Sequence, residues 1–232
     1  MELAESFSNL VGEVRIVDDV ASEFVEVVAQ SYALRARSNF AFALSGGPTA
    51  QRCYERLSML SESKISWWDV DIYWGDERCV PPDHPDSNEA MARRTLLNPV
   101  GAVNSVYPMR CDEGASAYQL RVSEVGFFDL IHLGVGPDGH TASIFPGSDA
   151  DSYVSGVLVQ LNTDPTNLNP HTRMTLTYPA LEMARHIVFT VSGESKRDAV
   201  RKLMQGIPIP ANKVRADKIT WILDHEALPN IP

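Results

Sequence analysis

Short apolar segments alternate with amphipathic segments of helical period, and this alternation constrains the fold more than any other feature of the chain. The strand-like segments are residues 14–17, 40–44, 70–74, 128–133, 156–161, 174–177, 186–191 and 220–223, with a short one near Val106. The helix-like segments are 20–34, 49–60, 88–97, 113–125 and 196–204. Alternating β and α segments predict an α/β fold whose mostly parallel sheet is flanked by helices on both faces.

The chain has 232 residues without a repeat, a low-complexity tract or a long linker, so we expect a single α/β domain over residues 1–232. A formal net charge of −10 argues against nucleic acid and membrane as partners, because both bind broad basic surfaces. A local basic pocket for a small anion stays compatible with this charge. The absence of a leader-like start and of a long apolar run predicts a cytoplasmic protein.

The cysteines are Cys53, Cys79 and Cys111, an odd and scattered set without a CxxC pair. This pattern argues against a disulfide scaffold and against a zinc site, and it fits a reducing compartment. We therefore expect no structural disulfide.

Open parallel sheets bind their ligands at the carboxyl ends of the strands. The loops that deserve inspection therefore follow Leu44, Trp74, Leu133, Thr177 and Val191.

The loop after Leu133 reads GVGPDGHTASIFPGS and places His140 in a glycine-rich turn, two residues after Asp138. Histidine is the side chain best suited to take and return a proton near neutral pH. A structural histidine and a ligand-free surface turn are the simpler alternatives. The GxGxxG pattern from Gly134 to Gly139 is a weak nucleotide signal, because Pro146 stops any helix that would receive a pyrophosphate.

The loop after Leu44 reads SGGPT and leads into a helix. Glycine amides and the positive helix terminus favour an anion site there, to which Ser45, Gly46, Gly47 and Thr49 would contribute. An ordinary turn with Thr49 as the helix cap is an equal alternative. A nucleophile elbow centred on Ser45 is a weaker one, because the first glycine of GxSxG is missing.

Charged residues occupy three further positions. Asp76 and Arg78 follow the strand that ends at Trp74, where Arg78 could bind a phosphate or carboxylate with two donors. Arg173 precedes a strand. Lys196 opens a helix, where a cation opposes the helix dipole, and a bound anion would explain its placement.

Together these segments resemble the 6-phosphogluconolactonase family. The matching signatures are SGGPT, GDERCVP with the later SN, LGVGPDGHTASIFPG, RMTLT and the turn from Gly193 to Lys196, in the family's order. The resemblance implies a Rossmann-like fold, similar to that of glucosamine-6-phosphate deaminase. In the first loop, Pro48 and Ala50 replace the commoner Ser and Pro, which removes one amide donor from the implied phosphate site.

The resemblance implies hydrolysis of 6-phospho-D-glucono-1,5-lactone in the oxidative pentose phosphate pathway. His140 would activate water and later protonate the ring oxygen, and Asp138 would orient it. Ser45, Gly46, Gly47, Thr49, Arg173 and Lys196 would hold the phosphate, while Asp76 would accept from substrate hydroxyls or hold Arg78. Loop amides or a cation such as Arg78 would stabilise the oxyanion.

The implied partner is thus a small phosphorylated sugar lactone, and neither a cofactor nor a metal is expected, since His140 has no partner at metal-ligand spacing. The sequence leaves the oligomeric state open, and a monomer is compatible with it. Two alternatives stay open. A deaminase-like isomerase would carry a glutamate after its Asp-Gly-His, and Thr141–Pro146 lacks one. A sugar-phosphate-sensing domain would have an attached helix-turn-helix, for which the residues before Val14 leave no room.

Overall fold

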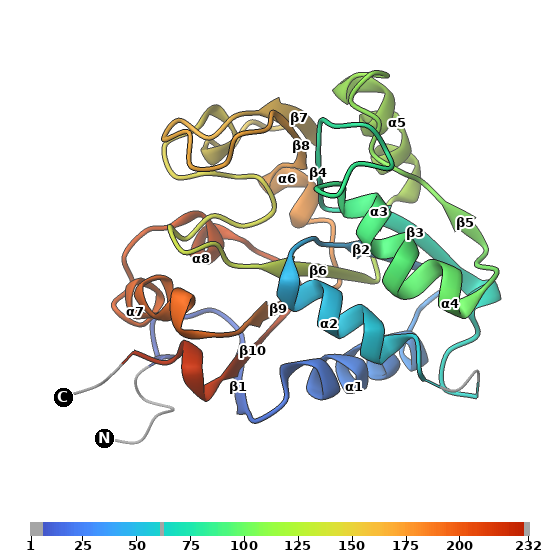
Figure 1. The fold of residues 1–232 in the computed structure, drawn as a ribbon, viewed down its shortest axis with the longest axis horizontal. Coiled ribbons are helices and arrows are strands. Elements are labelled where there is room, and N and C mark those ends of the chain that lie inside the picture. The colour runs from blue at the N-terminus through green and yellow to red at the C-terminus, as the bar shows by residue number, and fades with distance from the viewer. Residues whose placement is uncertain (1–6, 61–62, 230–232) are drawn as a thin grey trace.

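The computed structural model describes residues 7–60 and 63–229, and its centre is a seven-stranded parallel sheet (Figure 1). The strands lie in the order β1-β10-β9-β6-β2-β3-β5. Their bounds are β1 (Glu13–Val17), β2 (Phe40–Leu44), β3 (Val70–Trp74), β5 (Ser105–Val106), β6 (Leu130–Gly134), β9 (His186–Val191) and β10 (Lys218–Asp224). The predicted mostly parallel sheet with flanking helices is confirmed.

The helices occupy most of the segments that the sequence predicts. They are α1 (Val20–Ala33), α2 (Pro48–Leu57), α3 (Asn88–Ala92), α4 (Asn98–Val100), α5 (Ala115–Val125), α6 (Tyr178–Leu181), α7 (Arg197–Met204) and α8 (Pro210–Lys213). Single helical turns form at η2 (Trp67–Asp69), η4 (Asp149–Asp151), η5 (Glu194–Lys196) and η6 (His225–Ala227). The helix predicted over residues 88–97 is divided, because the π-helical turn η3 (Arg93–Leu97) follows α3.

The start of each of the first two helices follows from its capping residue. The Asp19 carboxylate accepts hydrogen bonds from the amides of Ala21 and Ser22, and α1 begins at Val20, the position that the sequence predicts. Helix α2 instead has Gly47 as its N-cap, with a φ of +92°, and begins with Pro48, where a missing N–H has no cost. Thr49 is therefore inside the helix, and the alternative that made it the cap is wrong.

The central strands β2 and β9 are buried along their whole length. Strands covered on both faces need continuous apolar runs, and the sequences FAFAL and HIVFTV meet that need. The Phe189 and Trp221 rings stack with centroids 3.8 Å apart across β9 and β10. This rigid centre fixes the positions from which the loops at the carboxyl edge leave the sheet.

A second, antiparallel sheet of three strands was not foreseen from the sequence. It consists of β4 (Asp76–Arg78), β8 (Arg173–Leu176) and β7 (Val159–Asn162), in the order β4-β8-β7. Two sequence expectations are therefore wrong: residues 76–78 are a strand and not a loop, and the loop after Thr177 is not at the ligand edge of the parallel sheet. The polar sequence of β4 hid this strand, because its buried carboxylates are satisfied by residues distant in the sequence.

Cys79 and Cys111 form a disulfide, with their Cα atoms 5.4 Å apart. The expectation of no disulfide is therefore wrong. The two cysteines are 32 positions apart, one directly after β4 and the other before α5, so only the tertiary fold brings them together. Cys53 is free and buried. Within residues 7–60 and 63–229, no helix is both long and apolar enough to cross a membrane.

Candidate active site

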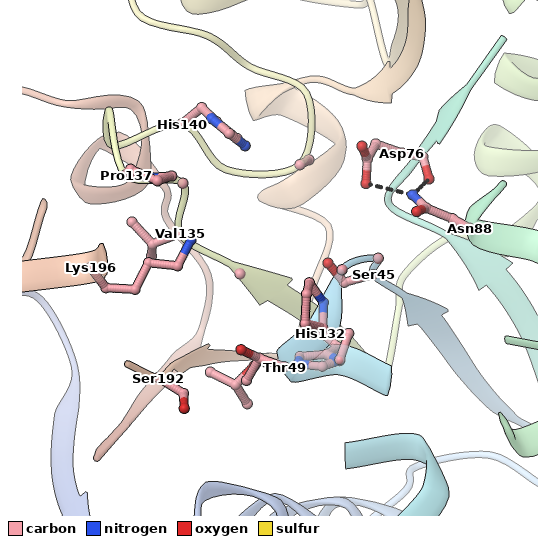
Figure 2. A pocket seen from close by; sticks show the side chains of 18 of the residues that line it. Ser45, Thr49, Asp76, Asn88, His132, Val135, Pro137, His140, Ser192 and Lys196 are labelled. Atoms are coloured by element: carbon pink, nitrogen blue, oxygen red, sulfur yellow. Dashed lines mark hydrogen bonds between the residues drawn. The ribbon is translucent and has the colours of Figure 1, made fainter. Parts of the chain in front are cut away.

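A cavity of about 450 Å³ opens at the carboxyl ends of β2, β3, β6 and β9. It is lined by His140 and by every residue that the sequence predicts to bind substrate, namely Ser45, Gly46, Gly47, Thr49, Asp76, Arg78, Arg173 and Lys196. Figure 2 shows His140 and Lys196 on one side of this cavity and Asp76 with Asn88 on the other. The fold thus gathers the chemically distinctive loops around one space.

His140 is oriented by Asp138. The Asp138 Oδ1 atom lies 2.6 Å from Nδ1 of the His140 ring and also accepts from the His140 backbone amide at 3.1 Å. The edge of the ring meets Phe145, with centroids 5.0 Å apart. Because Nδ1 donates to the carboxylate, the Nε2 atom carries the lone pair, and it bonds to no other described residue. A base with this geometry can accept a proton from a molecule in the cavity.

Charge also couples the two residues. Burial opposes ionisation of the Asp138 carboxyl, but the hydrogen bond and the charge of His140 outweigh it, so the pKa of Asp138 is lowered. Asp138 is therefore a carboxylate at neutral pH, and it accepts the Nδ1 proton of His140.

The turn around His140 requires glycine at two positions. A Cβ atom on Gly136 would lie 2.1 Å from Nδ1 of His140, which is far inside contact distance. Gly139 has a φ of +97°, a conformation that other residues rarely adopt. The GxGxxG pattern is therefore explained by the turn that presents His140, without any nucleotide.

Asp76 is 5% exposed, and three groups surround its carboxylate. Ser143 donates its hydroxyl to Oδ2 at 2.6 Å, and the Asn88 amide lies 3.4 Å from Oδ1. Arg173 Nη1 is 3.9 Å from Oδ2, which is an ion-pair distance but too long for a hydrogen bond. Among the described residues, the Asp76 carboxylate forms its ion pair with Arg173 and not with Arg78.

The adjacent Glu77 has a structural role. Its carboxylate accepts from the backbone amides of Asn88 and Glu89, each at 2.7 Å, and from the Ser87 hydroxyl at 3.0 Å. These donors form the first turn of α3, whose positive end favours a carboxylate. Glu77 thus holds α3 against β4, and of the two carboxylates only that of Asp76 lines the cavity.

Two guanidinium groups line the cavity from the second sheet, where Arg78 and Arg173 are paired in register. The Nε atoms of both are buried without a partner in the described part of the chain. Arg78 donates from Nη1 to the carbonyl of Asp86 at 2.5 Å. Burial lowers the pKa of Arg173, an effect that the charge of Asp76 opposes, and a guanidinium stays charged at neutral pH. The Nη atoms of Arg173 and Nη2 of Arg78 donate a hydrogen bond to no described residue, and unused donors beside a cavity suit an anionic ligand.

The loop before α2 offers further donors. The amides of Gly46 and Gly47 donate to none of the residues that the structure describes, whereas the Ser45 amide donates to the Tyr54 hydroxyl at 2.7 Å. Gly46 is also required by packing, because a Cβ there would lie 1.8 Å from Oδ1 of Asn88. Two glycine amides, with the Ser45 and Thr49 hydroxyls, are thus left for an anion at the start of α2.

Lys196 faces the cavity from the turn that precedes α7. No carboxylate of the described residues lies within ion-pair distance of its ammonium group. Burial lowers the pKa of Lys196, and the charge of Asp138 opposes this. A half-buried cation without a protein partner is best explained by an anionic ligand.

Other cavity residues were not selected from the sequence, chiefly Asn88, His132 and Thr190. His132 is fully buried beneath the cavity, with Nδ1 2.9 Å from the Tyr54 hydroxyl and Nε2 2.8 Å from the Thr190 hydroxyl. A histidine inside the apolar strand FDLIHL was the available signal for it. Asn88 could have been selected from the Ser-Asn pair of the family signature. In residues 7–60 and 63–229, no three His, Cys, Asp or Glu side chains are grouped to hold a metal ion.

Comparison with known families gives one consistent result. Residues 13–221 match the family model described as glucosamine-6-phosphate isomerases/6-phosphogluconolactonase. The chain is 34% identical to a 6-phosphogluconolactonase of Synechocystis sp. over 218 residues, which cover 86% of this chain and 88% of that protein. It is 33% identical to one of Mycobacterium tuberculosis, with the same coverage of both chains.

Solved structures agree. The 6-phosphogluconolactonase of Thermotoga maritima superposes with a TM-score of 0.79 at 27% identity, covering 91% of this chain and 99% of that one. A monomeric glucosamine-6-phosphate deaminase superposes with a TM-score of 0.77 at 20% identity, covering 93% of this chain and 98% of that one. The second likeness shows a shared fold only.

Proposed function

Because this chain belongs to the glucosamine-6-phosphate isomerase/6-phosphogluconolactonase family, we propose that it uses His140 and Asp138 to hydrolyse its substrate, 6-phospho-D-glucono-1,5-lactone. The reaction yields 6-phospho-D-gluconate, and it is the lactone-opening step of the oxidative pentose phosphate pathway. The single observation that supports the mechanism most is the 2.6 Å contact between Asp138 and Nδ1 of His140, at the edge of a cavity rich in unused cationic donors.

In the proposed mechanism, water attacks the lactone carbonyl while His140 Nε2 takes one of its protons. The carbonyl π electrons move to oxygen, giving a tetrahedral oxyanion. When this intermediate collapses, the bond from the carbonyl carbon to the ring oxygen breaks, and His140 returns its proton to that oxygen. A lactone is an activated ester, so no covalent enzyme intermediate is needed. General acid–base catalysis of this kind contributes about 10²–10⁴-fold.

The substrate phosphate is assigned to the anion donors of the cavity. We place it among the hydroxyls of Ser45 and Thr49, the amides of Gly46 and Gly47, and the cations Arg173 and Lys196. The oxyanion would be stabilised by loop amides or by Arg78, whose guanidinium lines the same cavity. This assignment explains how a chain of formal charge −10 binds an anion: the cations Arg78, Arg173 and Lys196 face one space.

The test is acid release from freshly generated 6-phosphogluconolactone, followed against the spontaneous opening of the same lactone. The proposal expects catalysed release well above that background, and no ammonia from glucosamine 6-phosphate. Ammonia release without lactone opening would establish the deaminase reaction instead.

A cytoplasmic location is proposed on the basis of the substrate, which is a charged metabolite that does not cross a membrane unaided. The scattered cysteines no longer support it, since two of them form a disulfide.

A further inference from the structure

Ser143 joins the histidine loop to all three strands of the second sheet. Its hydroxyl donates to Asp76 of β4 at 2.6 Å, and its amide donates to the Thr175 hydroxyl of β8 at 3.1 Å. Its carbonyl accepts from the Asn162 amide of β7 at 2.8 Å. Ser143 is fully buried, and it lies three residues after His140.

The three contacts have separable roles. The backbone bonds to Thr175 and Asn162 hold the loop, and they do not depend on the Ser143 side chain. Thr141 anchors the same loop to the main sheet through the carbonyl of Gly134. Removing the Ser143 hydroxyl therefore leaves the loop attached at both ends and changes only the surroundings of the Asp76 carboxylate.

That carboxylate forms an ion pair with Arg173 but no hydrogen bond. Arg173 Nη1 is 3.9 Å from Asp76 Oδ2, the oxygen that accepts from Ser143, while the Asn88 amide lies on the other oxygen. A buried carboxylate oxygen that loses its hydrogen-bond donor forms a bond with the nearest other donor, because an unsatisfied buried charge is costly. The nearest other donor is the Arg173 guanidinium.

We propose that Ser143 is a positioning residue that keeps the Asp76 carboxylate from forming a direct hydrogen bond with Arg173, and so keeps the Arg173 guanidinium available to the substrate anion. The proposal rests on the proposed function only in taking the phosphorylated lactone as that substrate. Ser143 touches neither substrate nor base. Its hydroxyl donates to the Asp76 oxygen that would otherwise accept a hydrogen bond from Arg173.

The test is a double-mutant cycle of Ser143→Ala and Asp76→Asn, with kcat and KM measured for the lactone and the inhibition constant measured for inorganic phosphate. Ser143→Ala should raise KM and the phosphate inhibition constant together by about tenfold, the scale of one charge-assisted hydrogen bond. Its kcat should stay within about twofold of wild type, because the pair of His140 and Asp138 is untouched. In the Asp76→Asn background, the same change should alter KM by less than about twofold, since a carboxamide forms no ion pair with Arg173.

Ser22→Ala is the matched control. Its hydroxyl also donates to a carboxylate, that of Asp19, but at the exposed start of α1 and outside the cavity. If Ser143→Ala fails to fold, Ser143→Cys preserves the shape with a weaker donor and should give a smaller rise in KM.

A wild-type KM in Ser143→Ala, a fall in kcat alone, or an equal rise in KM in the Asp76→Asn background would each overturn the inference. A wild-type enzyme without lactonase activity would instead overturn the proposed function.

Discussion

Asp138 and His140 form a contact that only glycine at position 136 allows, because a side chain there would occupy the space between Nδ1 and Oδ1. The built Cβ lies 2.1 Å from the ring nitrogen and 2.7 Å from the carboxylate oxygen. The contact between His140 and its orienting carboxylate thus depends on Gly136, and the three residues form one structural unit.

Gly136→Ala tests this unit directly. The new methyl group must displace His140 or Asp138, and a shift of about 1 Å is enough to cost about 10²-fold in rate. We expect kcat to fall by about that factor while KM changes little. Steady-state lactone hydrolysis measures both constants. Gly75→Ala is the control, because its nearest contact, the Leu44 carbonyl oxygen at 3.5 Å, is of ordinary length. Full activity in Gly136→Ala would show that the close packing of the turn is not needed.

Arg173→Ala should mainly raise KM, by about tenfold or more, since a remote phosphate contact contributes to the bound and transition states alike. Arg173→Lys should recover part of this loss, because it restores the charge without the planar pair of donors. Inorganic phosphate should inhibit the alanine variant more weakly than wild type. An unchanged KM would place the phosphate elsewhere in the cavity.

Acid should destabilise the fold through His132. Its burial lowers the pKa of this ring from 6.5 to about 3. Between these values the unfolded chain binds a proton that the folded chain does not, so the contribution is complete above pH 6.5 and is lost as pH falls toward 3. Denaturant unfolding at several pH values should therefore show less loss of stability on acidification for His132→Gln than for wild type. If the unfolding free energies of the variant and the wild type fell equally with pH, His132 would not be a neutral, buried residue in the folded protein.

The main sheet could be predicted from the sequence because its central strands are apolar on both faces. FAFAL and HIVFTV could only be buried strands, and the loops that follow them were therefore found at the correct edge. Asp76 to Arg78 could not be recognised as a strand in the same way. The charges of Asp76 and Glu77 are compatible with burial because they accept hydrogen bonds from Ser143, Ser87, Asn88 and Glu89, which lie 10 to 67 positions away.

The candidate site was predicted residue by residue, but its internal contacts were not. Asp76 was expected to accept from substrate or to hold Arg78. The structure instead places its carboxylate beside Arg173, and the oxygen nearest Arg173 accepts a hydrogen bond from Ser143. The link between Cys79 and Cys111 was missed for the same reason. Both pairings depend on how the second sheet packs, which no local pattern encodes.

The central claim is that His140 is the base that activates water, and His140→Ala tests it most directly. Acid release from fresh 6-phosphogluconolactone should be measured with saturating substrate, after subtraction of spontaneous opening. We expect a kcat lower by about 10²–10⁴-fold, with KM within about threefold of wild type. Turnover near the wild-type value in that variant would contradict it and remove His140 from the mechanism.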